Sequence, residues 1–488
     1  MFSRRRLLEA ALIAGALWYL GSVLVVAFAR IGYPYDLEWM EGGSLEHVAR
    51  VVRGQAIYVP PSLDFTPYIY APLYYYVAAL FTKLFGLRLL SLRLVSLAAS
   101  LGVFVLIALL VRRRTRSRLA ALIAAGLFAA LFQRSGAFFD LARVDALALF
   151  LTLFPVWLLL GSERHDVAAG VLLAAAFFTK QSMLLVAAPI VLARAGSLRG
   201  PRRLQCLAAF VAVAAGGSVV LHLSTHGWST YYLFTLPASH SWLPRAWIGF
   251  WRDDLFMTVP VAMLALAFAI AGARRGGTVP AVEVAVVLGC LAESWSSRMH
   301  SGAFSNVLMP VYASLAWQTG VVMGRLDESA SAPALSGRPI VRALGPWAIL
   351  VQLALLWFPP WKQIPTAADR AAGDALVANL AAVADPILVP YHPHLARLAG
   401  KATYAHEMAL HDVLRGGNRE AADALAAEIR RRLWAREFAA VIVDQDWWPA
   451  ELSAPYLRSQ TLFPREPAVF WPRTGWPTRP RDLYERRP

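Results

Sequence analysis

A short acidic stretch, "YPYDLEWMEGG" (residues 33–43), carries three carboxylates, Asp36, Glu38 and Glu41, among aromatic residues. It comes soon after the apolar run 7–29, in which Glu9 is the one charged residue. A carboxylate at a membrane surface can act as a general base that deprotonates a hydroxyl, or it can bind a divalent cation. The alternative is a solvated loop, or a helix cap ahead of the segment "SLEHVARVVRG".

Two further charges stand at the start of an apolar segment. Arg143 and Asp145 lie in "FFDLARVDALALF". Charged side chains at the mouth of a membrane helix are costly, and they usually face a cavity or pair with one another. A functional pair is one interpretation. The other is a structural pair between Asp140 and Arg143, which are three residues apart.

Cations also occur where two other apolar segments meet polar residues. Lys180, in "FFTKQSMLL", is one of four lysines in a chain that otherwise uses Arg. Its compact ammonium group suits a phosphate, although a lysine at a helix end can also reach toward the membrane surface. "SWSSRMHSGAFSN" brings Arg298, His300 and Asn306 together before another apolar segment. We expect an anionic ligand such as a lipid phosphate there, and a simple interfacial arginine is the alternative.

The composition indicates which elements hold these residues. The chain has 488 residues, of which 58% are hydrophobic and 16% charged, and its mean hydropathy is +0.50. Soluble domains contain about 25% charged residues, so we expect a polytopic α-helical membrane protein. The net charge of +16 fits basic cytoplasmic loops and not a nucleic-acid partner. No P-loop, GxSxG or GxGxxG before a helix occurs, so nucleotide-driven and serine-type chemistry are unsupported.

The apolar segments and basic clusters predict a topology. Four clusters should be cytoplasmic, at residues 4–6, 112–118, 194–203 and 273–277. This orientation requires 70–85 to be an interfacial or re-entrant helix and gives about 11 spanning helices, with the N-terminus inside. The predicted spans are 7–29, 89–111, 119–132, 144–160, 167–178, 181–193, 205–223, 255–272, 279–292, 303–323 and 341–358. All the candidate residues named above, in the first outer loop 31–69 and beyond, then face outward.

The composition shifts after "WFPPW" at residues 357–361. Residues 362–488 contain no spanning run. Apolar stretches at 384–392 and 438–448 have the pattern of buried strands, between helical stretches 367–383 and 419–436. We therefore predict a membrane domain over 1–361 and a small extracytoplasmic α/β domain over 362–488. The histidines at 392, 394, 406 and 411 lack the spacing of a metal site, so structural roles are the simpler interpretation.

The order of these motifs resembles the GT-C superfamily of integral-membrane glycosyltransferases. The resemblance rests on the acidic outer loop, "TPYIYAPLYYYVAALFTKLFG", "LRLVSLAAS", the Arg143 and Asp145 helix mouth and "TKQS". It is strongest over residues 1–190 and points to bacterial family 39, whose members are similar to protein mannosyltransferases and aminoarabinose transferases. The scarcity of Lys also fits a GC-rich bacterial genome. The expected location is the bacterial cytoplasmic (inner) membrane.

The resemblance implies transfer of a sugar from a polyprenyl-phosphate donor to a glycan, lipid or protein acceptor outside the membrane. In this family the catalytic acidic residue usually belongs to an Asp-Glu pair, whereas this chain has Asp-Leu-Glu at the same place. Asp36 is ranked first as the base, Glu41 second and Glu38 third. The residues expected to bind the donor phosphate are Lys180, Arg298, Arg143 and His300. Those expected to make other substrate contacts are Asp145, Gln181, Asn306 and Tyr74. Binding of a divalent cation by Asp36 and Glu41 is an alternative role for the same loop. The alternatives are a lipid-linked-sugar transporter (flippase) and a non-catalytic assembly protein with this fold.

Overall fold

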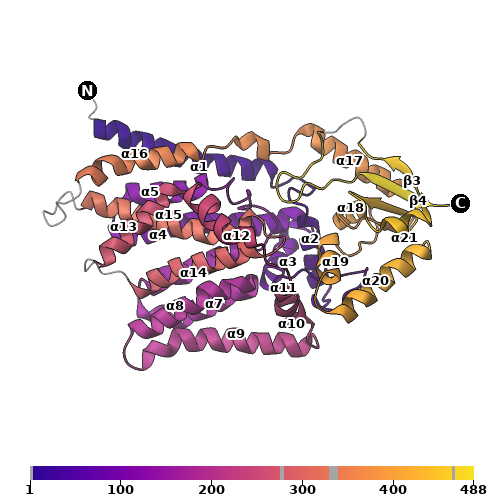
Figure 1. Ribbon diagram of the computed structural model, residues 1–488, viewed down its shortest axis with the longest axis horizontal. Coiled ribbons are helices and arrows are strands. Elements are labelled where there is room, and N and C mark those ends of the chain that lie inside the picture. The colour runs from indigo at the N-terminus through magenta and orange to yellow at the C-terminus, as the bar shows by residue number, and fades with distance from the viewer. Residues whose placement is uncertain (1–3, 275–279, 329–338, 464–467) are drawn as a thin grey trace.

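A computed structural model describes residues 4–274, 280–328, 339–463 and 468–488. Its long apolar helices lie side by side, with the N-terminus at one end of the bundle and a small sheet at the other (Figure 1). The bundle helices are α1 (Arg4–Arg30), α4 (Leu89–Thr115), α5 (Arg118–Ala130), α6 (Asp145–Leu159), α7 (Asp166–Thr179), α8 (Leu184–Ser197), α9 (Gln205–Ser224), α13 (Pro260–Arg274), α14 (Ala281–Met299), α15 (Met309–Glu328) and α16 (Pro339–Leu355). Each predicted apolar segment is thus largely helical. The 275–277 part of the fourth basic cluster lies outside the described residues.

Fewer of these helices than predicted are long enough to cross a membrane alone. Within the described ranges, the four that pass this test are Arg5–Arg30, Leu89–Thr115, Arg202–Ser224 and Ser305–Leu326, or six spans if two bent helix pairs each count as one. Other apolar helices are shorter, and only neighbouring helices can shelter their ends from lipid. The topology with about 11 spans stays a prediction.

Small residues let the bundle helices approach closely. A Cβ on Gly126 of α5 would lie 2.5 Å from the Cα of Ala16 in α1. A Cβ on Gly170 of α7 would lie 2.3 Å from the carbonyl oxygen of Cys206 in α9. Glycine at such crossings is typical of membrane helices, which associate through close packing.

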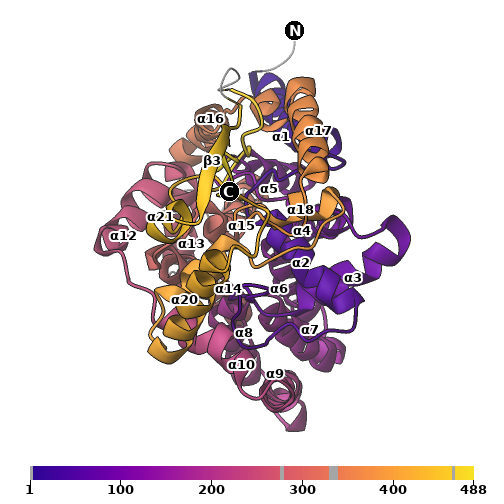
Figure 2. The same cartoon turned by 90° about the vertical axis from the view of Figure 1, so that its right-hand side faces the viewer.

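Short helices lie between the bundle and the sheet. They are α2 (Glu41–Val52), α3 (Leu73–Phe85), α10 (Trp228–Thr230), α11 (Leu236–Ala238), α12 (Pro244–Gly249), α18 (Pro393–Leu398) and α19 (Glu407–Leu414). The predicted segment 70–85 forms α3, which packs against α2 and α4. The end-on view in Figure 2 shows the sheet and its helices covering this end of the bundle.

The sheet has four strands in the order β1-β2-β4-β3, with β1 and β2 parallel and the other pairs antiparallel. The strands are β1 (Ile387–Leu388), β2 (Ala440–Val443), β3 (Tyr456–Thr461) and β4 (Asp482–Arg486), and the accompanying helices are α17 (Ala367–Ala382), α20 (Arg419–Trp434) and α21 (Pro449–Ser453). The strands predicted at 384–392 and 438–448 are confirmed as β1 and β2, although both are shorter. Tyr35 of the first loop packs into the core beneath this sheet, edge-on to Phe470 at 5.1 Å.

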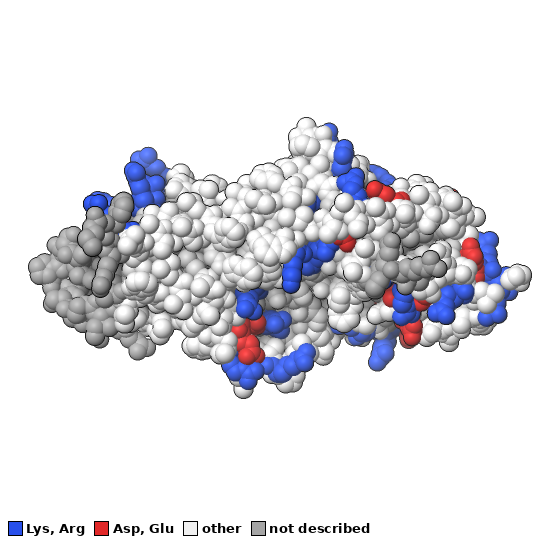
Figure 3. All heavy atoms as spheres, turned by 90° about the horizontal axis from the view of Figure 1, so that it is seen from above, with Lys and Arg blue, Asp and Glu red and all other residues white. Residues whose placement is uncertain are grey.

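The distribution of charge agrees with a membrane protein. On the face shown in Figure 3, charged side chains gather from the middle of the view to the right, over the half that carries the sheet, and basic side chains appear again at the upper left. An uncharged band lies between them. Such a band is what the hydrocarbon core of a bilayer requires.

Candidate active site

Arg93, a fully buried residue of α4, anchors the acidic loop at residues 33–43. Its guanidinium donates to the carbonyl oxygens of Tyr33 at 2.5 Å and Tyr35 at 2.8 Å. It also donates to both oxygens of Glu41, at 2.9 and 2.6 Å. One side chain therefore fixes the path of the loop between α1 and α2.

Glu41 is held on every side. Each of its carboxylate oxygens accepts one N–H from Arg93 and one from the backbone, Ala142 on Oε1 at 2.7 Å and Leu37 on Oε2 at 2.8 Å. Burial would raise the pKa of Glu41, but Arg93 outweighs it and holds that pKa below its usual value. With both oxygens engaged and no exposed surface, Glu41 is poorly placed to take a proton or bind a cation. Its contacts are those of an anchor.

A second buried pair lies beside the first. Arg30, the last residue of α1, donates to Asp140 Oδ2 at 2.7 Å and Oδ1 at 2.5 Å. The alternative pairing of Asp140 with Arg143 is therefore wrong, because Arg30 engages both oxygens of Asp140. We call Arg30, Asp140, Arg93 and Glu41 the anchoring cluster.

Arg143 pairs with the acidic loop instead. Its Nη1 donates to Glu38 Oε2 at 2.7 Å, and its Nη2 donates to the Tyr70 hydroxyl at 2.8 Å. Glu38 is 2% exposed. Burial raises the pKa of Glu38 to about 7, although Arg143 acts to lower it. Glu38 is thus a carboxylate that titrates near neutral pH while it touches a cation.

Lys180 joins two carboxylates from different helices. Its Nζ lies 3.1 Å from Asp145 Oδ1 and 3.3 Å from Glu293 Oε1. Asn306 donates to the same Asp145 oxygen at 2.9 Å, while Asp145 Oδ2 is buried without a hydrogen-bond partner. Arg143 lies near enough for its charge to act on Asp145. We call Glu38, Arg143, Asp145, Lys180 and Glu293 the acid-rich cluster, since it holds three carboxylates and two cations.

Two predicted substrate contacts take part in packing. Gln181 donates to the carbonyl oxygens of Ile69 at 2.6 Å and Leu233 at 3.2 Å, which ties the first outer loop to the segment after α10. Tyr74 is fully buried, and its hydroxyl lies 3.0 Å from the Leu92 carbonyl oxygen. Its polar group is thus used between α3 and α4, and its assignment as a substrate contact stays a prediction.

Arg298 and His300 lie apart from the acid-rich cluster. Arg298 Nε donates to Asp254 Oδ2 at 2.9 Å, so the anion expected beside this arginine is a protein carboxylate. The ring of His300 lies 6.0 Å from Trp242 and 6.2 Å from His240. Of the four residues predicted to hold a phosphate, the structure brings together Lys180 and Arg143.

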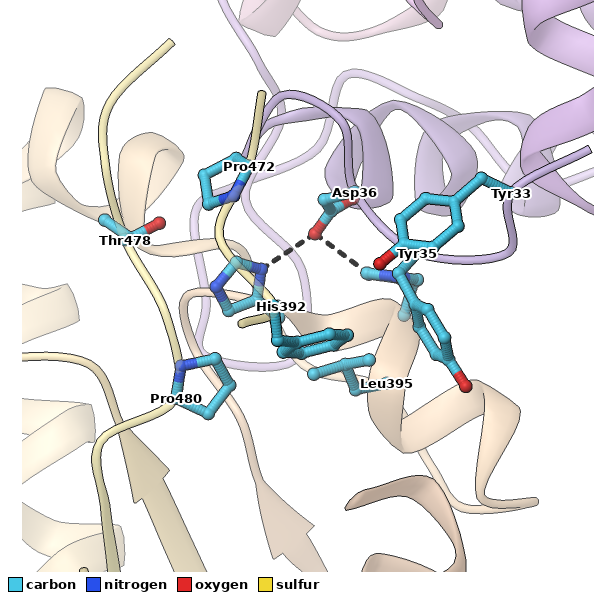
Figure 4. A pocket seen from close by; sticks show the side chains of 10 residues that line it. Tyr33, Tyr35, Asp36, His392, Leu395, Pro472, Thr478 and Pro480 are labelled. Carbon is cyan, nitrogen blue, oxygen red and sulfur yellow. Dashed lines mark hydrogen bonds and ion pairs between the residues drawn. The ribbon is translucent and has the colours of Figure 1, made fainter. Parts of the chain in front are cut away.

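Asp36 points the other way, toward the sheet. Its Oδ1 accepts the backbone N–H of Gly42 at 2.9 Å, and its Oδ2 lies 2.7 Å from Nδ1 of His392. Asp36 and His392 line a small pocket with aromatic residues and prolines, among them Tyr33 and Tyr35 (Figure 4). The base ranked first in the sequence thus borders a pocket and contacts a residue more than 350 positions away.

The sequence analysis gave His392 only a structural role and did not single out Asp444. His392 Nε2 lies 2.9 Å from Asp444 Oδ2, so His392 bridges two carboxylates. His392 lies in the predicted strand segment 384–392 and Asp444 in the predicted segment 438–448, and the contact would have been expected if these strands had been recognised as parallel neighbours. Arg93 was also missed, although an arginine within an apolar helix is itself a signal. Among the described residues, no group of three or more His, Cys, Asp or Glu side chains is arranged to hold a metal ion.

Comparisons with known proteins show which fold this chain has. Residues 69–227 match the family described as dolichyl-phosphate-mannose-protein mannosyltransferase. No curated protein sequence gives a significant match. The crystal structure of ArnT from Cupriavidus metallidurans bound to undecaprenyl phosphate superposes with a TM-score of 0.59 at 13% identity, over 96% of this chain and 97% of ArnT. The apo structure of the same protein gives 0.56, with the same identity and coverage.

The chain has the GT-C fold. An oligosaccharyltransferase from Archaeoglobus fulgidus, in complex with Zn and sulfate, is similar with a TM-score of 0.51 at 14% identity, over 89% of this chain and 68% of that one. A likeness at such low identity defines the architecture and not the substrate. The family match begins at Ile69 of this chain and includes Arg93, Arg143 and Lys180.

Proposed function

We propose that the protein is a membrane glycosyltransferase, which moves a sugar from a polyprenyl-phosphate donor to an acceptor hydroxyl. The observation that carries this proposal is the contact between the acidic loop and the buried cations of the acid-rich cluster, made by Glu38 and Arg143 at 2.7 Å. This contact lies at one end of an apolar helix bundle. The chain shares its fold with ArnT, whose structure has been solved with undecaprenyl phosphate bound.

The reaction suits this arrangement. The acceptor oxygen attacks the anomeric carbon while its proton passes to a carboxylate, and the bond from that carbon to the phosphate oxygen breaks. Polyprenyl phosphate leaves with the bonding electrons, and cations stabilise the charge that grows on it. Lys180 and Arg143 are the cations we assign to the phosphate; Asp145 positions Lys180, and Asn306 in turn donates to Asp145.

We assign different roles to the three carboxylates of the loop. Asp36 is the base, because it borders the pocket and each of its oxygens keeps a lone pair beyond the contacts described. Glu38 is the counter-ion that Arg143 releases when phosphate arrives. Glu41 fixes the loop through Arg93.

The orientation of the protein in the membrane is part of the proposal. We place the protein in the bacterial inner membrane. Its N-terminus lies in the cytoplasm, and residues 362–488 lie on the outer side of that membrane. Reporter fusions after residues 115 and 365 test this arrangement. A cytoplasmic signal from the second fusion would overturn it.

The decisive experiment uses the purified protein in lipid vesicles with a radiolabelled polyprenyl-phosphate sugar and a mixture of acceptors. Wild type should transfer label, Asp36→Asn should lose almost all transfer, and Glu9→Gln should behave as wild type, since Glu9 pairs with Arg5 at the exposed end of α1. Full transfer by Asp36→Asn would refute the base assignment. Label that enters the vesicles without transfer would favour a transporter, and donor binding without either event would favour a non-catalytic protein.

A further inference from the structure

Asp36, His392 and Asp444 form a continuous chain of hydrogen bonds. His392 Nδ1 lies 2.7 Å from Asp36 Oδ2, and His392 Nε2 lies 2.9 Å from Asp444 Oδ2 (Figure 4 shows the first of these contacts). All three residues are at most 9% exposed. They come from the first loop, from the segment after β1 and from the residue after β2. The fold therefore brings three distant segments to one side chain.

The parallel strands explain how the chain is assembled. Ile387 of β1 pairs with Ala440 of β2, and Leu388 pairs with Val441. Parallel strands end at the same edge of a sheet, and residues beyond their carboxyl ends commonly form sites. Asp444 directly follows β2, and His392 lies four residues beyond β1. The sheet edge thus presents an imidazole, backed by a carboxylate, to the acidic loop.

The contacts specify the protonation of His392. Both ring nitrogens face carboxylate oxygens, an arrangement that favours a proton on each nitrogen and therefore a charged ring. Burial alone would lower the pKa of His392, but Asp444 and Asp36 outweigh it and raise that pKa to about 10. The raised value means that the stabilising effect of the charged ring is complete below pH 6.5 and is lost as pH rises through about 10.

We propose that His392, held by Asp444, is a positioning residue for the base Asp36, so that the edge of the C-terminal sheet completes the active site. The inference rests on the proposed function. The imidazolium would fix the direction of the Asp36 carboxylate through the 2.7 Å hydrogen bond to Oδ2. The remaining lone pairs of Asp36 then receive the acceptor proton. The C-terminal region acts in this way as part of the catalytic machinery and not as a cover.

Other titratable groups surround this chain of hydrogen bonds. His394 Nδ1 lies 3.4 Å from Asp36 Oδ2, and neither of its ring nitrogens makes a hydrogen bond. A Cβ on Gly42 would lie 2.3 Å from that nitrogen, so the loop and His394 are in close contact. The charge of Asp444 acts on Tyr391 and on Arg479, and His406 lies near His392. Among these, His394 is the group best placed to act directly on Asp36.

The test measures transfer by His392→Gln and Asp444→Asn against pH, with the protein in lipid and the donor used above. Loss of the cation beside Asp36 should lower kcat by roughly 10- to 100-fold, the loss expected for a charge-assisted hydrogen bond. KM values for donor and acceptor should change little. The kcat of wild type should fall as pH rises through about 10, where His392 loses its charge, and this alkaline limb should be absent from His392→Gln. Addition of imidazole should partly restore kcat in His392→Gly.

His406→Gln is the matched control. His406 is also a buried histidine between the loop and the C-terminal region, but its ring contacts the Trp39 carbonyl oxygen at 3.0 Å and the backbone N–H of Met408, not Asp36. It should keep the wild-type pH profile. Wild-type kcat in His392→Gln and Asp444→Asn, together with an alkaline limb that persists in His392→Gln, would overturn the inference, provided that wild type is active. Absence of transfer by wild type would instead overturn the proposed function.

Discussion

The anchoring cluster and the acid-rich cluster differ in how well their charges are satisfied. The anchoring cluster pairs two arginines with two carboxylates, and each pair makes two hydrogen bonds between its side chains. The acid-rich cluster has one more carboxylate than cations, and Arg143 contacts Glu38 through a single hydrogen bond. Buried charges are tolerated when they are fully paired, and an incomplete set marks a place where a ligand can enter. The contrast separates residues that shape the site from residues that use it.

The largest effect should come from breaking the anchoring cluster. Arg93→Leu leaves the Glu41 carboxylate buried without its cation and releases the carbonyl groups of Tyr33 and Tyr35. Removal of one partner from a buried ion pair costs about 3–5 kcal/mol, so we expect a much lower melting temperature or little folded protein. Unfolding in detergent, followed by tryptophan fluorescence, measures this. Arg252→Ala, in an exposed pair with Asp253, should melt as wild type does.

If Arg93→Leu melted as the wild type does and bound donor normally, the anchoring role would be refuted. In that case the two clusters would not differ as their contacts suggest.

Changes in the acid-rich cluster should reduce donor use, in addition to the stability cost of leaving buried carboxylates without their cation. Lys180→Ala removes the ammonium group that we assign to the donor phosphate. A hydrogen bond between charged groups contributes about 1.5–3 kcal/mol, which corresponds to a loss of roughly 10- to 150-fold in kcat/KM for the donor. Lys180→Arg should recover part of this loss. Steady-state kinetics with varied donor distinguish the three proteins, and an unchanged donor kcat/KM in Lys180→Ala would exclude Lys180 from the phosphate site.

The titration of Glu38 predicts a pH dependence for donor binding. Its pKa is raised from 4.5 to about 7, so the fold favours protonated Glu38; this preference is complete below pH 4.5 and lost as pH rises through about 7. Protonated Glu38 leaves Arg143 free for the phosphate. The KM for donor should therefore rise above pH 7, by at most about tenfold per pH unit for one proton.

Glu38→Gln provides the test of this coupling. The amide cannot ionise, so the donor KM of this variant should stay low and nearly constant from about pH 6 to 8. Measurement of KM at several pH values with Asp36 intact isolates the effect from the base. A pH dependence that persists in Glu38→Gln would assign the titration to another group.

Local patterns in the sequence predicted the helix bundle well, because membrane helices correspond to continuous apolar segments of the sequence. They also placed Lys180 and Arg143 among the site residues, since charges at the ends of apolar helices are costly. Patterns could not predict that Arg93 engages Glu41, or that His392 engages Asp36, because these contacts join distant segments. The contact between Asp36 and His392 depends on the parallel pairing of β1 with β2, which the local patterns of the two predicted strands do not specify.

The smallest effect is expected at Arg298, which the sequence grouped with Lys180. The side chain of Arg298 is 30% exposed and pairs with Asp254, whereas that of Lys180 is 8% exposed and faces Asp145 and Glu293. Partly exposed pairs contribute about 0–1 kcal/mol, so Arg298→Ala should change the donor kcat/KM by less than about fivefold. The same kinetic assay compares it with Lys180→Ala. If Arg298→Ala lost as much as Lys180→Ala, the phosphate site would extend to α14 and Asp254, and the acid-rich cluster would be one part of a longer charged surface.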